Sequence, residues 1–315
     1  MMSQSTIEIS KGLTGRNVLK LMDFTLEEIQ YLLKVALNLK QNPISDALSG
    51  KTLAMIFEKS STRTRVSFEV GMLQLGGHAL SLSPKDLQLG RGETIADTAR
   101  VLSSYVDGIL LRTTDHNRVK ELAEYSKVPV INGLCNLYHP CQALADLMTI
   151  YELKGTFSGV KVVYVGDGNN VAHSLMIGCA KVGADFVIAT PKGYEPNENI
   201  FNQAKEIAQA TGGTIALSHN PDDAVKNADI IYTDVWVSMG QEEETEARMQ
   251  AFQPFQVNEA LLAKAKPDAN FLHCLPAVRG LEVTDEVMEG SQSAVFMQAE
   301  NRLHAQKAIL KEILK

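Results

Sequence analysis

The sequence predicts an α/β protein of two domains, each a parallel β-sheet flanked by helices, with the functional site in the interdomain cleft at the C-terminal ends of the strands. Short apolar runs alternate with segments of helical periodicity, and the connections between them are short, which is typical of parallel sheets. The length of 315 residues exceeds what one core usually holds, so about two domains are expected. Polar clusters follow the strands, at the edge where open α/β sheets bind ligands.

The first half of the chain contains at least three strand–helix units. The apolar run 52–57 predicts a short buried strand, and the spacing of Val66, Val70 and Leu73 predicts the helix that follows it. The other elements expected in this half are a helix at 94–106, a strand at 108–111 ending at Arg112, a helix at 118–125, a strand at 128–131 and a helix at 140–152.

The second half restarts the alternation after Gly155 and Gly159, which bracket the predicted domain junction. Strands are expected at 160–165, 186–189, 230–233 and 270–273, with helices between them. The acidic segment 241–246 predicts a mobile excursion. A last helix is expected at 300–315. The predicted domains are therefore 1–150 and 151–297, with the C-terminal helix, about 298–315, packing back on the first.

Composition excludes several classes of partner. A formal net charge of -7 and a pI near 5.6 give no electrostatic footprint for nucleic acid or for an acidic membrane surface. The N-terminus has no basic segment followed by an apolar core, and no run approaches about 18 apolar residues, so we expect a cytoplasmic protein. The four cysteines lack metal-ligand spacing, which predicts reduced thiols and no structural metal.

Six polar clusters each lie just past the end of a predicted strand. They are 61–65, Arg112, 139–142, 167–170, 234–240 and 273–279. Because ligands of open α/β sheets bind at this edge, the clusters of both halves are expected to meet in one cleft.

The cluster Ser61-Thr62-Arg63-Thr64-Arg65 predicts a phosphate site. It stands where the strand 52–57 gives way to a helix, so free backbone N–H groups, the helix dipole, hydroxyls and a guanidinium converge on one point. The alternative is a capped surface helix with two solvated arginines.

The segment Gly166-Asp167-Gly168-Asn169-Asn170-Val171 does not predict a dinucleotide site, although it follows a strand and opens a helix. Val171 replaces the third glycine, and the next strand ends at Thr190-Pro191-Lys192 without an acidic residue for a ribose hydroxyl. The asparagine pair is better suited to a small polar ligand.

Together these residues resemble the ornithine carbamoyltransferases. The matching segments, in family order, are 57–65 (FEKSSTRTR), 139–146 (HPCQALAD), 166–170 (GDGNN), 234–240 (DVWVSMG) and 273–276 (HCLP). The first two are shared with aspartate carbamoyltransferases and identify only the carbamoyl phosphate half. The last two resemble the ornithine branch.

The resemblance implies a first domain that binds carbamoyl phosphate. The residues that would bind it are Ser61, Thr62, Arg63, Thr64, Gln88, Arg112, His139, Gln142, Cys274, Leu275 and Arg302. Gln88 would reach in from a neighbouring subunit. Arg112 and His139 would point donors at the carbamoyl oxygen, where negative charge grows in the transition state.

The second domain would bind ornithine through Asn170, Asp234, Ser238 and Met239. Asp234 and Cys274 would join Arg112 and His139 as catalytic residues, because the attacking ammonium must lose a proton. Neither a metal nor an organic cofactor is implied, since carbamoyl phosphate is already activated. The family assembles as trimers. Two alternatives stay open: a sibling enzyme that uses aspartate, putrescine or acetylornithine, and a non-catalytic sensor of the same fold.

Overall fold

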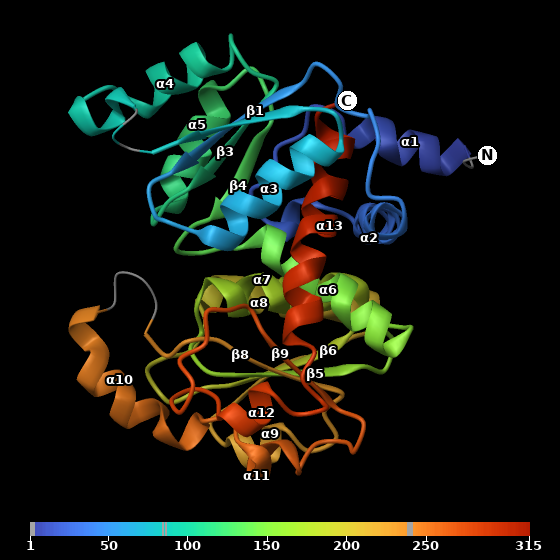
Figure 1. The fold of residues 1–315 in the computed structure, drawn as a ribbon. Coiled ribbons are helices and arrows are strands. Elements are labelled where there is room, and N and C mark those ends of the chain that lie inside the picture. Colours follow the sequence, from blue (N-terminus) through green and yellow to red (C-terminus); the bar gives the residue numbers. More distant parts are fainter. Residues whose placement is uncertain (1–3, 84, 86, 238–241) are drawn as a thin grey trace. The chain divides into compact units, whose positions relative to one another are not determined.

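The protein folds into two compact α/β units. The structure, a computed structural model, describes residues 4–83, 85, 87–237 and 242–315. One unit comprises Met1–Met148 and Asn301–Lys315, and the other comprises Thr149–Glu300. Both contain a parallel sheet flanked by helices, so the predicted fold class is confirmed (Figure 1).

The first unit is built on a four-stranded parallel sheet in the order β2-β1-β3-β4. Its strands are β1 (Thr52–Phe57), β2 (His78–Leu82), β3 (Gly108–Arg112) and β4 (Val130–Leu134). The two central strands, β1 and β3, are buried along almost their whole length. The helices of this unit are α1 (Gln4–Leu13), α2 (Leu26–Gln41), α3 (Thr62–Gln74), α4 (Ile95–Leu102) and α5 (His116–Tyr125), with short 3-10 helices at Leu21–Asp23 and Gln88–Arg91.

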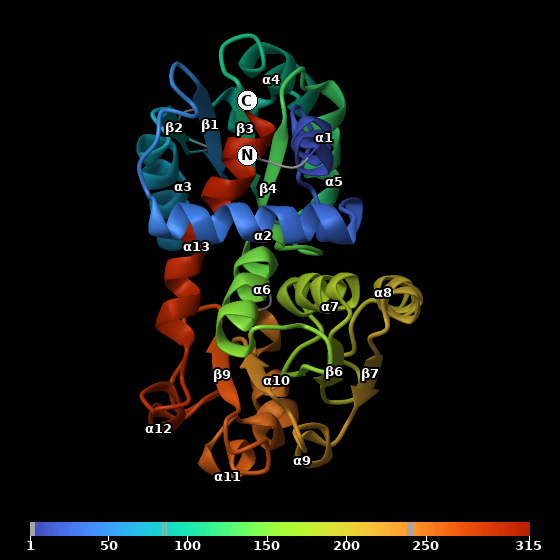
Figure 2. The same ribbon diagram turned by 90° about the vertical axis from the view of Figure 1, so that its right-hand side faces the viewer.

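The second unit is built on a five-stranded parallel sheet in the order β7-β6-β5-β8-β9. Figure 2 labels three of these strands, β6, β7 and β9. The strands are β5 (Lys161–Val165), β6 (Asp185–Ala189), β7 (Ile215–Ser218), β8 (Ile230–Thr233) and β9 (Asn270–His273). The helices are α7 (Asn170–Val182), α8 (Glu198–Thr211), α9 (Pro221–Ala224), α10 (Thr245–Phe252), α11 (Glu259–Leu262) and α12 (Asp285–Met288), with 3-10 helices at Glu242–Glu244 and Gln253–Phe255. One face of the sheet packs on a core that includes Trp236, Phe252 and Phe271.

Two long helices contain residues of both units. α6 (Pro140–Lys154) leaves the first unit after Met148, and α13 (Val295–Ile313) returns to it at Asn301. Of α13 and the tail after it, residues 301–315 therefore belong to the first unit. Among the described residues, no helix is long and apolar enough to span a membrane.

The sequence does not predict β2 and β7, two of the four edge strands, because few of their side chains are buried. β2 has no fully buried residue and β7 has one, so neither presents the continuous apolar run of a central parallel strand. By contrast β1, β8 and β9 occupy the predicted residues, and β4 begins at Val130 rather than at 128.

The mobility expected of the acidic segment 241–246 stays a prediction. Gln241 lies outside the described residues, Glu242–Glu244 forms a 3-10 helix and α10 begins at Thr245. The stripe of Val66, Val70 and Leu73 correctly predicts α3 but is not its buried face: Val66 is 52% exposed and Leu73 is 73% exposed. Phe68 and Met72 are buried instead.

Candidate active site

In the first unit, the predicted phosphate site lies at the topological switch point of the sheet. The chain leaves β1 toward β2 on one side and returns to β3 on the other, so the loops after β1 and β3 diverge and open a crevice. Ser61 follows β1, and Arg112 is the last residue of β3, directly across from Phe57 in the register.

Ser61 begins α3 as predicted. Its backbone is extended and its side chain accepts a hydrogen bond from the Thr64 N–H at 3.2 Å, which is the geometry of an N-cap. Thr62 and Arg63 form the first turn, where backbone N–H groups and the helix dipole favour an anion.

Two buried arginines converge on the Thr64 hydroxyl. Arg302, on α13, donates from Nη2 to Thr64 Oγ1 at 3.2 Å, and Arg112 donates from Nη1 to the same oxygen at 3.4 Å. Both lone pairs of this oxygen are then used, so its own proton points away from the arginines. Arg302 Nη1 also donates to Gln142 Oε1 at 2.7 Å, and Gln142 Nε2 donates to Asp146 Oδ1 at 2.8 Å.

His139, the residue before α6, is neutral at pH 7. It is buried, and burial is the main reason that the pKa of its imidazole lies well below the ordinary value; the charges of Arg302, Arg112 and Arg63 lower it further. These charges also mean that three guanidiniums lie close to one imidazole. The first unit therefore gathers positive charge and donors around a point at the amino end of α3, as an anionic substrate with a polarised carbonyl requires.

Gln88 lies apart from this network. It opens the short 3-10 helix Gln88–Arg91 and its side chain is exposed. Its predicted role in a neighbouring subunit's site stays a prediction.

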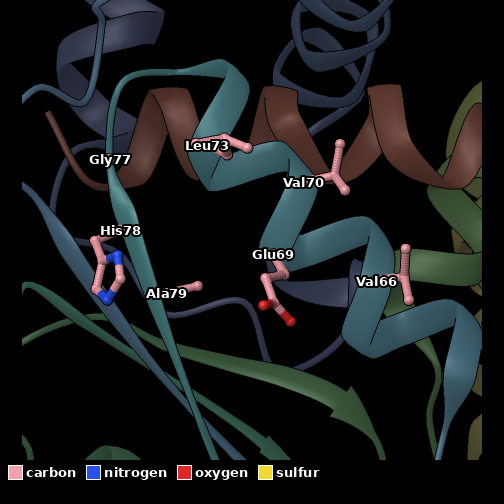
Figure 3. Close-up of a pocket in the computed structure, with 7 residues that line it drawn as sticks. All are labelled: Val66, Glu69, Val70, Leu73, Gly77, His78 and Ala79. Carbon is pink, nitrogen blue, oxygen red and sulfur yellow. The ribbon is translucent and has the colours of Figure 1, made fainter.

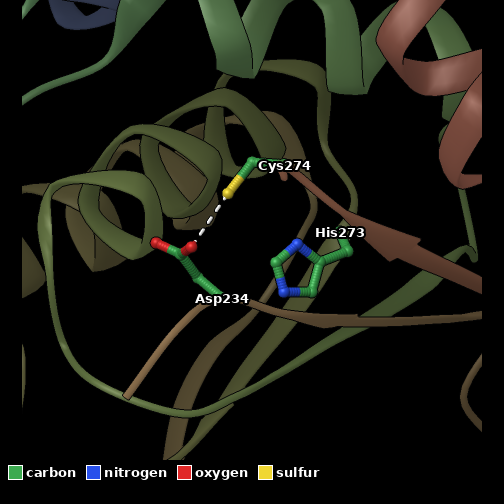
Figure 4. Close-up of side chains that lie close together, drawn as sticks. All are labelled: Asp234, His273 and Cys274. Atoms are coloured by element: carbon green, nitrogen blue, oxygen red, sulfur yellow. Dashed lines mark hydrogen bonds between the residues drawn. The ribbon is translucent and has the colours of Figure 1, made fainter. Parts of the chain in front are cut away.

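The second unit also places polar side chains at a switch point, between β5 and β8. Asp234 follows β8, and its Oδ1 accepts from Cys274 Sγ at 3.0 Å and from the Val235 N–H at 2.8 Å (Figure 4). Its Oδ2 accepts from Asn169 Nδ2 at 2.9 Å. The Cys274 thiol is thus a hydrogen-bond donor to a carboxylate, and Asp234 is fixed from three sides.

Asn169, which the sequence analysis names only as one of an asparagine pair suited to a small polar ligand, also supports Asp234. Its Oδ1 caps α7 by accepting from the N–H groups of Val171 and Ala172, both at 3.0 Å, while its Nδ2 holds Asp234. An asparagine just before a helical segment is an N-cap signal, and that signal distinguishes it from the predicted ligand Asn170, the first residue of the helix.

His273 supports the segment after β9 through hydrogen bonds. Its Nδ1 accepts from the Leu275 N–H at 2.9 Å, so the ring proton is on Nε2, which lies 3.3 Å from Glu282 Oε1. Leu275 has a φ of 58°, which non-glycine residues rarely adopt, so the chain turns sharply directly after Cys274.

Asp234, His273 and Cys274 do not form a metal site. Their potential ligand atoms lie within 4.8 Å of one another, but the Nδ1 lone pair is already used by Leu275 and the thiol proton by Asp234 (Figure 4). A metal would have to break both contacts. The geometry fits hydrogen bonding to a substrate better.

The glycine-rich turn after β5 is closed to a dinucleotide. A Cβ at Gly168 would lie 2.2 Å from Pro196 N, so the segment around Pro196 fills the space above the turn. The Gly168 N–H donates to Tyr194 O at 2.9 Å, and Asn169 occupies the N–H groups at the start of α7. The absence of a dinucleotide site, predicted from Val171, therefore has a structural reason.

Arg248 on α10 is a residue that the sequence does not single out. It is buried and donates from Nη1 to Asp167 Oδ2 at 3.0 Å and to Trp236 O at 3.1 Å, and from Nε to Glu244 at 2.9 Å. It thereby ties the loop after β5 to the chain just before Ser238 and Met239. These two predicted ornithine ligands lie outside the described residues.

The geometry can be compared with known proteins. The family model described as "Aspartate/ornithine carbamoyltransferase, carbamoyl-P binding domain" matches residues 16–152, and the one described as "Aspartate/ornithine carbamoyltransferase, Asp/Orn binding domain" matches residues 158–313. The chain belongs to the aspartate/ornithine carbamoyltransferase family.

Similar proteins cover nearly the whole chain. The ornithine carbamoyltransferase of Bacillus subtilis is 62% identical over 303 residues, covering 96% of this chain and 95% of that protein. The solved structure of ornithine carbamoyltransferase from Pyrococcus furiosus matches with a TM-score of 0.93 and 61% identity, covering 96% of this chain and 98% of that one. The structure of the Giardia lamblia ornithine transcarbamoylase has a TM-score of 0.87 at 35% identity and covers 95% and 98%. The resemblance found in the sequence motifs is confirmed.

Proposed function

We propose that this protein transfers the carbamoyl group of carbamoyl phosphate to the side-chain amine of L-ornithine, giving L-citrulline and phosphate. The observation that carries the proposal is the convergence of Arg112 and Arg302 on the Thr64 hydroxyl at the amino end of α3. Curated relatives 60% and 62% identical to this chain are named ornithine carbamoyltransferase, which supports ornithine over aspartate as the acceptor.

The first unit would hold carbamoyl phosphate. The first turn of α3, from Ser61 to Thr64, supplies N–H groups, hydroxyls and the Arg63 guanidinium for the phosphate. Arg112 and neutral His139 would donate to the carbamoyl oxygen, and Arg302 would complete the anion pocket. A neutral imidazole keeps one N–H, so His139 can donate a hydrogen bond to the carbonyl oxygen as negative charge grows on it.

The carbamoyl NH₂ would donate to Gln142 and to the backbone at Cys274 and Leu275. The last two residues belong to the second unit, so this part of the proposal requires the two half-sites to meet when substrates bind.

The second unit would hold ornithine. Asp234 supplies a carboxylate for an ammonium group, and Cys274 supplies a thiol beside it, while Asn170 and the segment with Ser238 and Met239 would take the α-carboxylate and α-amino group. The free side-chain amine then attacks the carbamoyl carbon. The bond from that carbon to the phosphate oxygen breaks, phosphate leaves with the electron pair, and the amine nitrogen loses one proton.

The exposed face of α3 supports assembly into trimers. Val66, Val70 and Leu73 of α3 line an open apolar pocket together with Gly77 to Ala79 at the start of β2 (Figure 3). A second copy of the chain would cover these side chains and bring Gln88 to a neighbouring phosphate site. We place the enzyme in the cytoplasm, where its four cysteines, which form no disulfide in the structure, stay reduced.

Citrulline formation by the purified protein tests the proposal. With carbamoyl phosphate present, ornithine should give a carbamoylated product, whereas aspartate, putrescine and acetylornithine should give little or none. A faster reaction with any of those three amines would assign the chain to a sibling activity. No product with any amine would favour a sensor.

A further inference from the structure

Arg302 has a third partner that the proposed chemistry does not use. Besides Gln142 and Thr64, its guanidinium donates from Nε to Gln306 Oε1 at 2.8 Å. Gln306 stands one turn further along α13, and its side chain is fully buried. While Nη2 of Arg302 faces the Thr64 hydroxyl, its Nη1 and Nε are therefore fixed by the side-chain oxygens of Gln142 and Gln306.

The amide of Gln306 can take only one orientation. Its Nε2 donates to Ser67 Oγ at 2.6 Å, and Ser67 Oγ in turn donates to the carbonyl of Arg63 at 2.5 Å. If the amide were flipped, its NH₂ would face the Nε–H of Arg302 and two donors would oppose each other. The Nε–H of Arg302, which can only donate, therefore sets the orientation of the amide, and Ser67 anchors the other end of the amide.

Two side chains, those of Gln306 and Ser67, thus link Arg302 to the first turn of α3. The chain of hydrogen bonds runs from Arg302 through Gln306 and Ser67 to the backbone of Arg63, where the phosphate is proposed to bind. An arginine has several rotatable bonds, so a cation meant to clamp an anion needs its plane fixed before the anion arrives.

We propose that Gln306 is a positioning residue of the carbamoyl phosphate site, which fixes the guanidinium plane of Arg302 relative to the amino end of α3. This inference rests on the proposed function of that site. Its removal should weaken phosphate binding through Arg302, although Gln306 itself does not touch the ligand.

A Gln306→Met variant tests the role, because methionine has a similar length and offers no amide. Its Kd for inorganic phosphate, measured by titration calorimetry, and its KM for carbamoyl phosphate should both rise about tenfold, less than the roughly hundredfold cost of a 1 Å misplacement. The KM for ornithine, measured with saturating carbamoyl phosphate, should stay within about twofold.

Gln74→Met is the matched control. Gln74 lies on α3 and accepts from Lys307 Nζ at 2.7 Å, so this variant also removes an amide acceptor from a buried cation at the same helix contact. It touches neither Arg302 nor the first turn of α3. Gln74→Met should lower Tm about as much as Gln306→Met does, and it should leave the phosphate Kd unchanged.

The outcomes separate the two proposals. Wild-type protein that does not bind phosphate in competition with carbamoyl phosphate would overturn the proposed function itself. If the wild type binds phosphate, the inference on Gln306 is overturned by either of two results: an unchanged phosphate Kd in Gln306→Met, or an equal loss of phosphate affinity in Gln74→Met. Either result would show that Gln306 only fills the core. If Gln306→Met does not fold, Ser67→Ala decides: releasing the amide should raise the phosphate Kd about two- to tenfold, and an unchanged Kd would overturn the inference.

Discussion

Replacing Asp234 by asparagine is expected to affect the stability and the ornithine affinity of the second unit separately. The carboxylate accepts on Oδ1 from Cys274 and Val235 and on Oδ2 from Asn169. An asparagine has one oxygen only. If that oxygen keeps the two contacts on the Oδ1 side, the new NH₂ group faces the Nδ2 donor of Asn169.

Asn169 cannot rotate its amide to relieve the conflict. Its Oδ1 already accepts from the N–H groups of Val171 and Ala172 at 3.0 Å each, and from Tyr164 OH at 3.2 Å. Two opposed donors in a buried network cost about 1–3 kcal/mol of the free energy of unfolding. For a unit of this size that corresponds to a Tm lower by roughly 2–12 °C.

The ornithine affinity falls for a different reason, because the substrate ammonium loses its counter-charge. A hydrogen bond to a charged group contributes about 1.5–3 kcal/mol, so the KM for ornithine should rise about ten- to a hundredfold in Asp234→Asn. The KM for carbamoyl phosphate should change little, since the residues proposed to bind its phosphate lie in the first unit.

The double variant Asp234→Asn with Asn169→Asp separates the two effects. An aspartate at 169 still caps α7 and now accepts from the new amide at 234, so Tm should return toward the wild-type value. The negative charge has moved from position 234 to position 169, so the KM for ornithine should stay high. A wild-type Tm in the single variant, or a restored KM in the double variant, would refute the reasoning.

Three further predictions concern the carbamoyl phosphate site and its coupling to ornithine. Arg63→Ala should lower kcat/KM for carbamoyl phosphate at least about a hundredfold with an unchanged Tm, and near-normal activity would remove Arg63 from the phosphate site. Ornithine should bind about 5–150-fold more tightly by calorimetry when a carbamoyl phosphate analogue is present, and equal affinities would contradict coupled half-sites. Because the pKa of His139 is lowered in the folded protein, the unfolded chain binds a proton at a higher pH than the folded protein does. The free energy of unfolding should therefore fall as the pH falls below about 6.5. Denaturant melts should show a smaller loss of stability between about pH 7.5 and 5.5 for His139→Gln than for the wild type.

The fold was predictable where burial is complete. Strands β1, β8 and β9 are apolar runs bounded by polar clusters, and the structure has them at the predicted residues. The edge strands β2 and β7 could not be recognised, because most of their side chains are only partly buried and they lack a continuous apolar run. The other two edge strands, β4 and β9, are largely buried and were predicted.

The positions of the site residues were predictable, but their partners were not. A polar cluster after a parallel strand indicates the ligand edge of the sheet, and that rule places Ser61, Arg112 and Asp234. It gives no information on contacts between distant segments. Arg248 meets Asp167 across 81 residues, and a lone arginine next to the acidic segment 241–246 reads as a solvated surface charge until that contact is seen.

The two units use the same topology for opposite charges. At its switch point the first unit gathers Arg112, Arg302 and the amino end of α3, which together attract a doubly charged anion. The second places the carboxylate of Asp234 beside the thiol of Cys274, which attracts an ammonium group. A bound phosphate would offset the positive charge of the first site before the cationic ornithine binds, so we expect carbamoyl phosphate to bind first.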